Sequence, residues 1–300
     1  MLLNRKSIYR QRRRVLIRKI GLISVLFIAL LWGLSYFSRH PKVIIQNILV
    51  EGNRVIPAEE IKDTVLEKIS GNYFFLFSKK NFLIYPKRSL EKDLLDKFHR
   101  IEYLSIKRLD RNTLAVSLKE WQGKYLLCEM NSDDDCYFMN SSGFVFDKAP
   151  NFSGSVYFRI YSSNLFKETD DLIGQTFMPM EEFAELLDFK EKIGKFFQIK
   201  ALEIGENGDY KFLLEIDGNN LNPYIAFKKP ARNAPATTSQ MLAGAGGESD
   251  FDKIFDNLAL AIGAEPLSLE LKDKIDSLEY LDLRYDNKVL YKFSAQGEKQ

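Results

Sequence analysis

The stretch IGLISVLFIALLWGLSYFS, residues 20–38, decides how this chain of 300 residues is organised. It contains no charged side chain, and a helix of this length reaches about 28 Å, close to the thickness of the hydrocarbon core of a bilayer. Trp32 and Tyr36 lie near its end, where amphipathic rings favour the interface between lipid and water. The sequence therefore predicts a single transmembrane helix at 20–38.

The charges on either side of this segment predict its orientation. Residues 1–19 carry eight basic side chains and no acidic one, whereas only Arg39 and Lys42 follow the segment closely. Basic residues are retained on the cytoplasmic side, so we expect a cytoplasmic tail at 1–19 and an extracytoplasmic remainder. The apolar run is longer than the core of a signal peptide, and no small-residue cleavage site follows it, so we expect an uncleaved anchor in the cytoplasmic (inner) membrane.

The formal net charge of +2 averages two unlike parts of the chain. Residues 1–41 carry nine positive and no negative side chains, while residues 42–300 have an acidic excess of seven. A basic arm of this kind can bind nucleic acid. Because the arm lies directly before a membrane span, we instead expect it to set the orientation of the span and to attract anionic lipid. We therefore expect no nucleic-acid partner.

Residues 43–121 have the pattern of one compact domain with the order β-α-α-β-β. Apolar residues recur at helical spacing after Pro57, which suits the first position of a helix, and they alternate at Leu114, Val116 and Leu118, as in a strand with one buried face. The expected elements are strands at 43–50, 101–109 and 114–118, with helices beginning at Pro57 and Ser89.

Residues 122–295 change to short strands and turns, with two helical patterns at 180–197 and 251–262. We expect a mixed β-sheet with packed helices here, followed by a short tail at 296–300. Strands are expected at 124–130, 137–140, 144–146, 156–161, 201–204, 210–216 and 224–228, and in a final pair within 278–293.

One segment of this second region, PARNAPATTSQMLAGAGGESD at 230–250, has too few bulky apolar residues to order itself. Its glycines lack the lysine and the strand-to-helix context of a phosphate-binding loop. The composition predicts a flexible surface insertion, which proteases should cut before any other external segment.

Cys128 and Cys136, the two cysteines, flank an acidic segment that reads as a hairpin tip. In an oxidising compartment a disulfide closing this short loop would stabilise the fold by about 2–3 kcal/mol. Two free thiols are the alternative, and the sequence leaves both open. No further cysteine or nearby histidine completes a tetrahedral set, so we expect no metal here.

Three stretches together resemble the FtsQ/DivIB family of bacterial cell-division proteins: IIQNILVEGNRVIPAEEI at 44–61, IEYLSIKRLDRNTLAVSLKEW at 101–121 and YLDLRYDN at 280–287. The first two resemble the POTRA domain of that family, and the third resembles the end of its second, β domain. The resemblance implies an α+β fold with a POTRA domain at 43–121 and an FtsQ-type β domain at 122–295. It also implies a scaffold of the divisome, located at the division site, that links division proteins and recruits the synthesis of the septal wall.

The C-terminal strand is the candidate binding site. Its residues divide between two faces, with Val289, Tyr291 and Phe293 on one and Lys288, Leu290 and Lys292 on the other. At a sheet edge such a strand can bind another chain by strand addition, whereas an ordinary closing strand with solvated lysines is the alternative. The resemblance implies that this region receives a segment of FtsB (DivIC in other bacteria), which comes with FtsL, and that Arg284 and Tyr285 match positions that contact the partner.

The sequence offers little for catalysis. Neither histidine, His40 or His99, lies near a nucleophile in a recognisable motif, and no phosphate loop or cluster of metal ligands occurs. We therefore expect no enzyme activity, no cofactor and no small-molecule substrate. Two other classes stay open: a POTRA-bearing chaperone or secretion-accessory protein of the cell envelope, and an external hydrolase with a convergent cleft of titratable groups.

Overall fold

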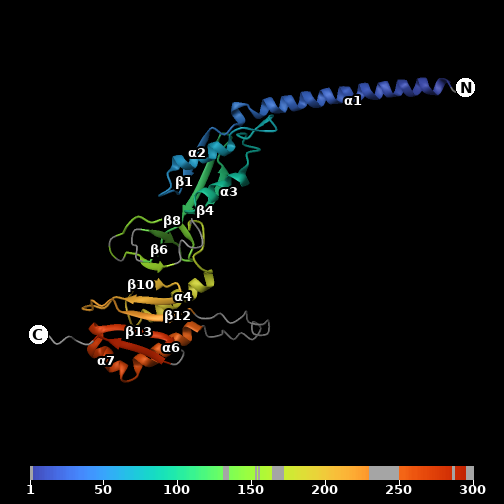
Figure 1. Ribbon diagram of the computed structural model, residues 1–300. Coiled ribbons are helices and arrows are strands. Elements are labelled where there is room, and N and C mark those ends of the chain that lie inside the picture. Colours follow the sequence, from blue (N-terminus) through green and yellow to red (C-terminus); the bar gives the residue numbers. More distant parts are fainter. Residues whose placement is uncertain are drawn as a thin grey trace. The chain divides into compact units, whose positions relative to one another are not determined.

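The chain begins with helix α1, Leu3–Ser38 (Figure 1). Its part Val15–Ser38 is long and apolar enough to cross a membrane, and it contains the span expected at 20–38. Most of its aliphatic and aromatic side chains are exposed, Trp32 and Tyr36 each by 78%. A helix that is apolar on every side and leaves those sides uncovered has the surface that lipid tails solvate.

The computed structural model describes residues 3–130, 135–152, 154, 156–163, 172–229, 250–285 and 288–294. The chain divides into two compact units, Met1–Trp121 and Gln122–Gln300. The expected α+β class, with one apolar N-terminal helix and a large mixed sheet, is confirmed.

The first unit contains a three-stranded sheet in the order β1-β5-β4. The central strand β5 pairs in parallel with β1 and antiparallel with β4. Its strands are β1 (Asn47–Glu51), β4 (Ile101–Arg108) and β5 (Thr113–Glu120), and its helices are α2 (Ala58–Ile69) and α3 (Lys87–Lys97). The helices and the sheet bury one shared core, formed chiefly by Ile61, Val65, Ile69, Leu90, Leu94, Ile106, Leu114 and Val116.

The alternation predicted for β5 is present: Leu114, Val116 and Leu118 are buried. The first strand is shorter than expected, because Pro41–Val43 forms a turn of 3-10 helix (η1) before it. A small hairpin of β2 (Asn72–Tyr73) and β3 (Phe77–Ser78) lies between the two helices. This hairpin was not expected, because only two residues of each strand pair and so few make no sequence pattern.

The loop from β1 to α2 is held against the end of β5. Gly52, with φ +87°, turns the chain where a Cβ would lie 2.0 Å from the carbonyl oxygen of Leu118, so only glycine fits without a shift of the backbone. The buried Glu120 carboxylate then accepts hydrogen bonds from the backbone N–H groups of Arg54, Val55 and Ile56.

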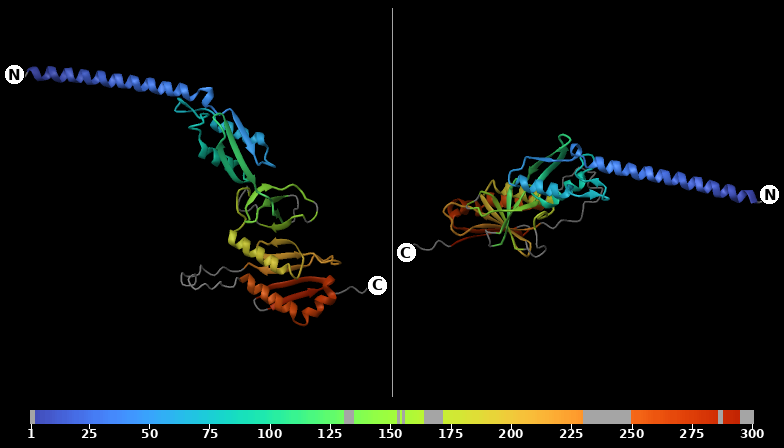
Figure 2. Two further views of the ribbon diagram at one scale, coloured as in Figure 1. Left: turned by 180° about the vertical axis from the view of Figure 1, so that it is seen from behind. Right: turned by 90° about the horizontal axis from the view of Figure 1, so that it is seen from above.

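The second unit is built on a nine-stranded mixed sheet in the order β14-β13-β12-β11-β10-β9-β6-β7-β8 (Figure 2). The pairs β12–β13, β9–β10 and β6–β9 are parallel, and the other pairs are antiparallel. The strands are β6 (Tyr125–Glu129), β7 (Cys136–Met139), β8 (Val145–Lys148), β9 (Phe158–Ser162), β10 (Ile199–Ile204), β11 (Asp209–Leu214), β12 (Tyr224–Lys228), β13 (Leu278–Tyr285) and β14 (Lys288–Phe293).

Three helices, α4 (Met180–Ile193), α6 (Asp250–Gly263) and α7 (Leu267–Lys274), contribute to the core of this unit. Four rings fill its centre: Phe189 of α4 lies 5.0 Å from Phe251 of α6 and 5.1 Å from Phe227, and Phe212 lies 4.8 Å from Phe227. Alternate residues of the strands supply this core, so one face of the sheet is covered by helices.

Most elements predicted for the second unit lie within a few residues of those observed, and β12 has the bounds expected for it. Helix α7 and the following 3-10 turn η2 (Ile275–Ser277) were not predicted. The insertion expected at 230–250 lies outside the described residues except for Asp250, which begins α6. The tail at 296–300 also lies outside them.

Candidate functional site at the edge of the large sheet

Strand β14 is the first strand of the large sheet and, among the described strands, pairs only with β13. The outer side of an edge strand carries backbone N–H and C=O groups that no neighbouring strand satisfies. The C-terminal strand therefore has the position that strand addition requires. This edge position follows from the strand order of the sheet.

The two faces of β14 differ in burial, and alternate residues are exposed and half-buried. Val289, Tyr291 and Phe293 are half-buried and pack against the core of the second unit. Lys288, Leu290 and Lys292 are exposed, Leu290 by 45%. The half-buried side chains hold β14 in the sheet, and the exposed ones remain available to a second chain.

Tyr285 ends β13 and pairs with Lys288 across the hairpin. Its side chain is 51% exposed, which is high for an aromatic residue at the end of a well-packed strand. A large ring with a polar tip is a favoured anchor in protein interfaces. Tyr285 and Leu290 are thus two exposed apolar groups on the terminal hairpin.

Arg284 lies in a network within its own sheet. Its guanidinium donates to both oxygens of the buried Asp282 carboxylate, at 2.9 and 2.7 Å, and to Asp209 of β11 at 3.0 Å. Burial disfavours the charge on Asp282, but the hydrogen bonds from Arg284 outweigh burial and lower the pKa of that carboxyl. The hydrogen bond to Asp282 raises the pKa of Arg284. Arg284 therefore braces β13, and only part of its side chain faces solvent.

Two acidic residues lie beside β14. Glu279 forms an ion pair with Lys292 and raises the pKa of that ammonium. Burial, together with a hydrogen bond to Glu270, raises the pKa of Tyr291. Exposed lysines on an edge strand oppose pairing between identical edges.

The sheet face opposite the helices carries a groove of about 760 Å³. Residues of β9 to β12 line it, among them Arg159, Tyr161, Lys211 and Tyr224. The Lys211 ammonium lies 5.0 Å from the centre of the Tyr224 ring, which stacks on Tyr280 of β13. The residues of this groove belong to different strands that meet only in the folded sheet, so no local sequence pattern predicts it.

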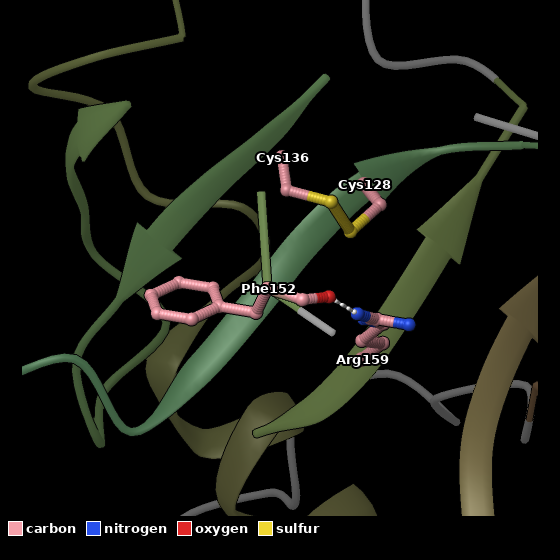
Figure 3. Close-up of a disulfide and its surroundings, with 4 residues drawn as sticks. All are labelled: Cys128, Cys136, Phe152 and Arg159. Carbon is pink, nitrogen blue, oxygen red and sulfur yellow. Dashed lines mark hydrogen bonds between the residues drawn. A yellow bond between two sulfur atoms is a disulfide. The ribbon is translucent and has the colours of Figure 1, made fainter. Parts of the chain in front are cut away.

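Cys128 of β6 and Cys136 of β7 form a disulfide between directly paired positions of neighbouring strands (Figure 3). The structure thus has the first of the two arrangements that the sequence left open. On β9, Arg159 donates a hydrogen bond of 2.8 Å to the carbonyl oxygen of Phe152, which ties the loop before β9 to the same region (Figure 3).

Within the part of the chain that the structure describes, no group of three or more histidine, cysteine, aspartate or glutamate side chains could hold a metal ion. Comparison of the chain with models of known protein families gives no match, and no curated protein matches it.

Proposed function

We propose that this protein is a bitopic, non-enzymatic scaffold of the bacterial division complex, of the FtsQ/DivIB kind. Its N-terminus lies in the cytoplasm, α1 anchors it in the cytoplasmic membrane, and both units lie outside. It binds FtsB or DivIC together with FtsL, and so recruits and regulates the synthesis of the septal wall at the division site. The single observation that carries this proposal is the position of β14 at the edge of the large sheet.

The arrangement of the first unit supports a POTRA domain. The turn glycine of the VEGN motif, Gly52, lies against the backbone of Leu118, and Glu120 caps the loop that follows Gly52. Both partners belong to the second resembling stretch, at 101–121. Two motifs that are about 60 residues apart thus form one piece of local structure, as expected if they belong to one domain type. We assign to this unit the binding of other membrane proteins of the division complex.

The terminal hairpin supports docking by strand addition. A segment of the partner would pair with the outer side of β14, and main-chain hydrogen bonds would supply affinity without demanding a particular side chain. Leu290 and Tyr285 would supply the apolar contacts at its rim. Arg284 would act as a positioning residue, since its guanidinium holds Asp282 and Asp209.

Capture of the detergent-solubilised full chain by an immobilised FtsB or DivIC segment tests this proposal. We expect Tyr285→Ala and Leu290→Glu each to weaken binding about tenfold or more, since each removes an interface anchor. A chain ending at residue 287 lacks β14 and should not bind.

Val156→Glu provides a matched control, because Val156 is 72% exposed and lies just before β9, five positions from β14 in the sheet. It should bind as the wild type does. Equal binding by all variants would move the interface away from β14. No binding by the wild type would contradict the proposed function and leave only the resemblance in fold.

A further inference from the structure

Beyond this function, the geometry points to a second contact with the membrane: we propose that the tip of the β2–β3 hairpin inserts into the lipid interface beside α1. The tip is Phe74 and Phe75, whose side chains are 87% and 91% exposed. They are the most exposed large apolar side chains among those that the structure describes. The inference rests on α1 crossing the membrane, but not on the division partners.

The backbone of the tip is strained, and both rings project away from the folded protein. Leu76 N–H donates to the carbonyl oxygen of Tyr73, which closes a tight turn, and Phe74 and Phe75 have φ of +47° and +62°. Positive φ at both central positions favours asparagine and glycine and disfavours bulky residues. Two phenylalanines at these positions cost free energy and gain no burial within the protein, which argues for a role outside it.

Hydrogen bonds hold this hairpin against the end of α1. Ser35 Oγ donates to the carbonyl oxygen of Leu76, Arg39 donates to that of Phe75 at 2.9 Å, and Ser78 N–H donates to Ser38 Oγ at 3.1 Å. Ser35 and Ser38 are buried, although the rest of the apolar stretch of α1 is largely exposed. The hairpin therefore covers the two serine hydroxyls near the end of α1.

These contacts set the depth of the tip. Ser35 lies three residues inside the end of the apolar helix, which is about 4.5 Å along its axis. A hairpin that bonds to Ser35 and Arg39 reaches back beside the last turn of the span. Its tip is then at the level where Trp32 and Tyr36 also lie, the boundary between headgroups and acyl chains.

The surroundings of the tip suit lipid. Leu83 and Ile84 are 67% and 42% exposed, and they follow Asn81, whose side chain donates to the carbonyl oxygen of Ser38. Residues 71–90 contain no acidic side chain and four basic ones. Exposed apolar groups between basic residues match an interface with anionic headgroups.

Site-directed fluorescence in vesicles tests the proposal. The full chain carrying Phe75→Cys is labelled with an environment-sensitive dye, since Cys128 and Cys136 are joined and leave no free thiol. It is then reconstituted in phosphatidylcholine and phosphatidylglycerol. We expect blue-shifted emission and strong quenching by spin labels near the headgroup end of the acyl chains, with weaker quenching by labels near the chain terminus.

Val55→Cys is the matched control, because Val55 is 59% exposed and its N–H bonds to Glu120, at the other end of β5 from the residues near α1. Its label should stay in water and remain unquenched. Leu26→Cys, inside α1, reports whether the span itself is inserted. A quenched label at position 26 with a water-exposed label at position 75 would overturn the proposal and leave the anchor intact.

A second outcome separates lipid from a second copy of the chain. If lipid shields the tip, quenching at position 75 is unchanged when the protein is diluted with excess lipid. Shielding that disappears on dilution would assign the tip to self-association and overturn the lipid assignment.

Discussion

At the scale of single residues, Gly52 and Glu120 hold the loop after β1 against the end of β5. Gly52 allows the chain to turn directly over the backbone of Leu118 after β1. Glu120 accepts hydrogen bonds from backbone N–H groups of the loop that follows. Unpaired buried N–H groups are costly. One carboxylate at the end of β5 therefore satisfies three N–H groups of the loop that leads to α2.

Gly52→Ala should destabilise the first unit by about 3 kcal/mol or more, because a Cβ there overlaps the Leu118 carbonyl and φ is positive. Gly71→Ala is the matched control: its φ is +84°, but a Cβ would meet nothing within 4 Å, so about 1 kcal/mol is expected. Urea unfolding, followed by Trp121 fluorescence in a Trp32→Phe background, measures both. Equal effects would show that the close approach to Leu118 does not matter.

The Asp282 carboxyl gives the second unit a dependence on pH. Its pKa is lowered in the folded protein, so its contribution to stability is present above the unfolded value of about 3.9 and is lost as the pH falls through the folded value. Asp282→Asn should cost about 2 kcal/mol at neutral pH, since it removes a charged hydrogen-bond acceptor of Arg284, and should flatten the loss of stability in acid.

Urea unfolding read by pulse proteolysis and mass spectrometry assigns this transition to the second unit. Asp273→Asn, at an exposed position of α7, controls for the loss of one negative charge. A wild-type acid profile in Asp282→Asn would contradict the prediction. The same network means that Arg284→Ala weakens β13 itself, so a loss of partner binding in that variant does not identify a direct contact.

At the scale of elements, the hairpin of β6 and β7 depends on its disulfide. The two strands pair over only four positions, and the covalent link joins the last of these pairs. It also stands next to β9, because Cys128 is in register with Tyr161. The link therefore holds together the end of the sheet that is farthest from β14.

Reduction of this disulfide should destabilise the second unit by about 2.5 kcal/mol, the loop-closure contribution for cysteines eight residues apart. The double variant Cys128→Ser/Cys136→Ser should match the reduced wild type and should not respond to reductant. Urea unfolding with and without dithiothreitol measures the difference. Thiols of the native, unreduced chain that react with a maleimide would contradict the pairing.

At the scale of the whole molecule, we expect the distribution of charge to determine how the chain is oriented in the membrane. Eight basic residues precede the apolar part of α1 or overlap its start, and two follow it closely. If the basic side is retained in the cytoplasm, as we expect, both units lie outside. This compartment is also the one in which a disulfide persists.

A C-terminal alkaline phosphatase fusion should therefore be active, and a C-terminal green fluorescent protein fusion exported unfolded should be dark. Replacing Arg12, Arg13, Arg14, Arg18 and Lys19 by glutamine should lower the phosphatase activity, since the positive-inside signal is lost. Replacing Lys272 and Lys274, two exposed residues of α7 in the second unit, should leave it unchanged. Full activity in the first variant would mean that another feature of the chain sets its orientation.

The sequence by itself determined most of the longer helices and strands, whereas the short helix α7 was not predicted although it buries Leu267 and Leu271. Local sequence patterns show which side chains are apolar and therefore in contact with protein or lipid. Examples are the uniform apolarity of 20–38, the alternation in β5 and the helical spacing in α4. Such patterns can be read without knowledge of the partner, because the period is set by the element itself, about 3.6 residues in a helix and 2 in a strand, and a run that is apolar on every side indicates a span.

Only the tertiary structure decided which elements meet. It placed β14 at an edge, directed the Arg284 guanidinium to Asp209, which is 75 positions earlier in the chain, and joined Leu76 of the β2–β3 hairpin to Ser35. Each depends on pairing between distant segments, and periodicity shows that a face is covered without showing what covers it. The short β2–β3 hairpin was not predicted because its paired residues are too few to make a sequence pattern. Its contacts with α1, which is distant in the chain, hold it in place.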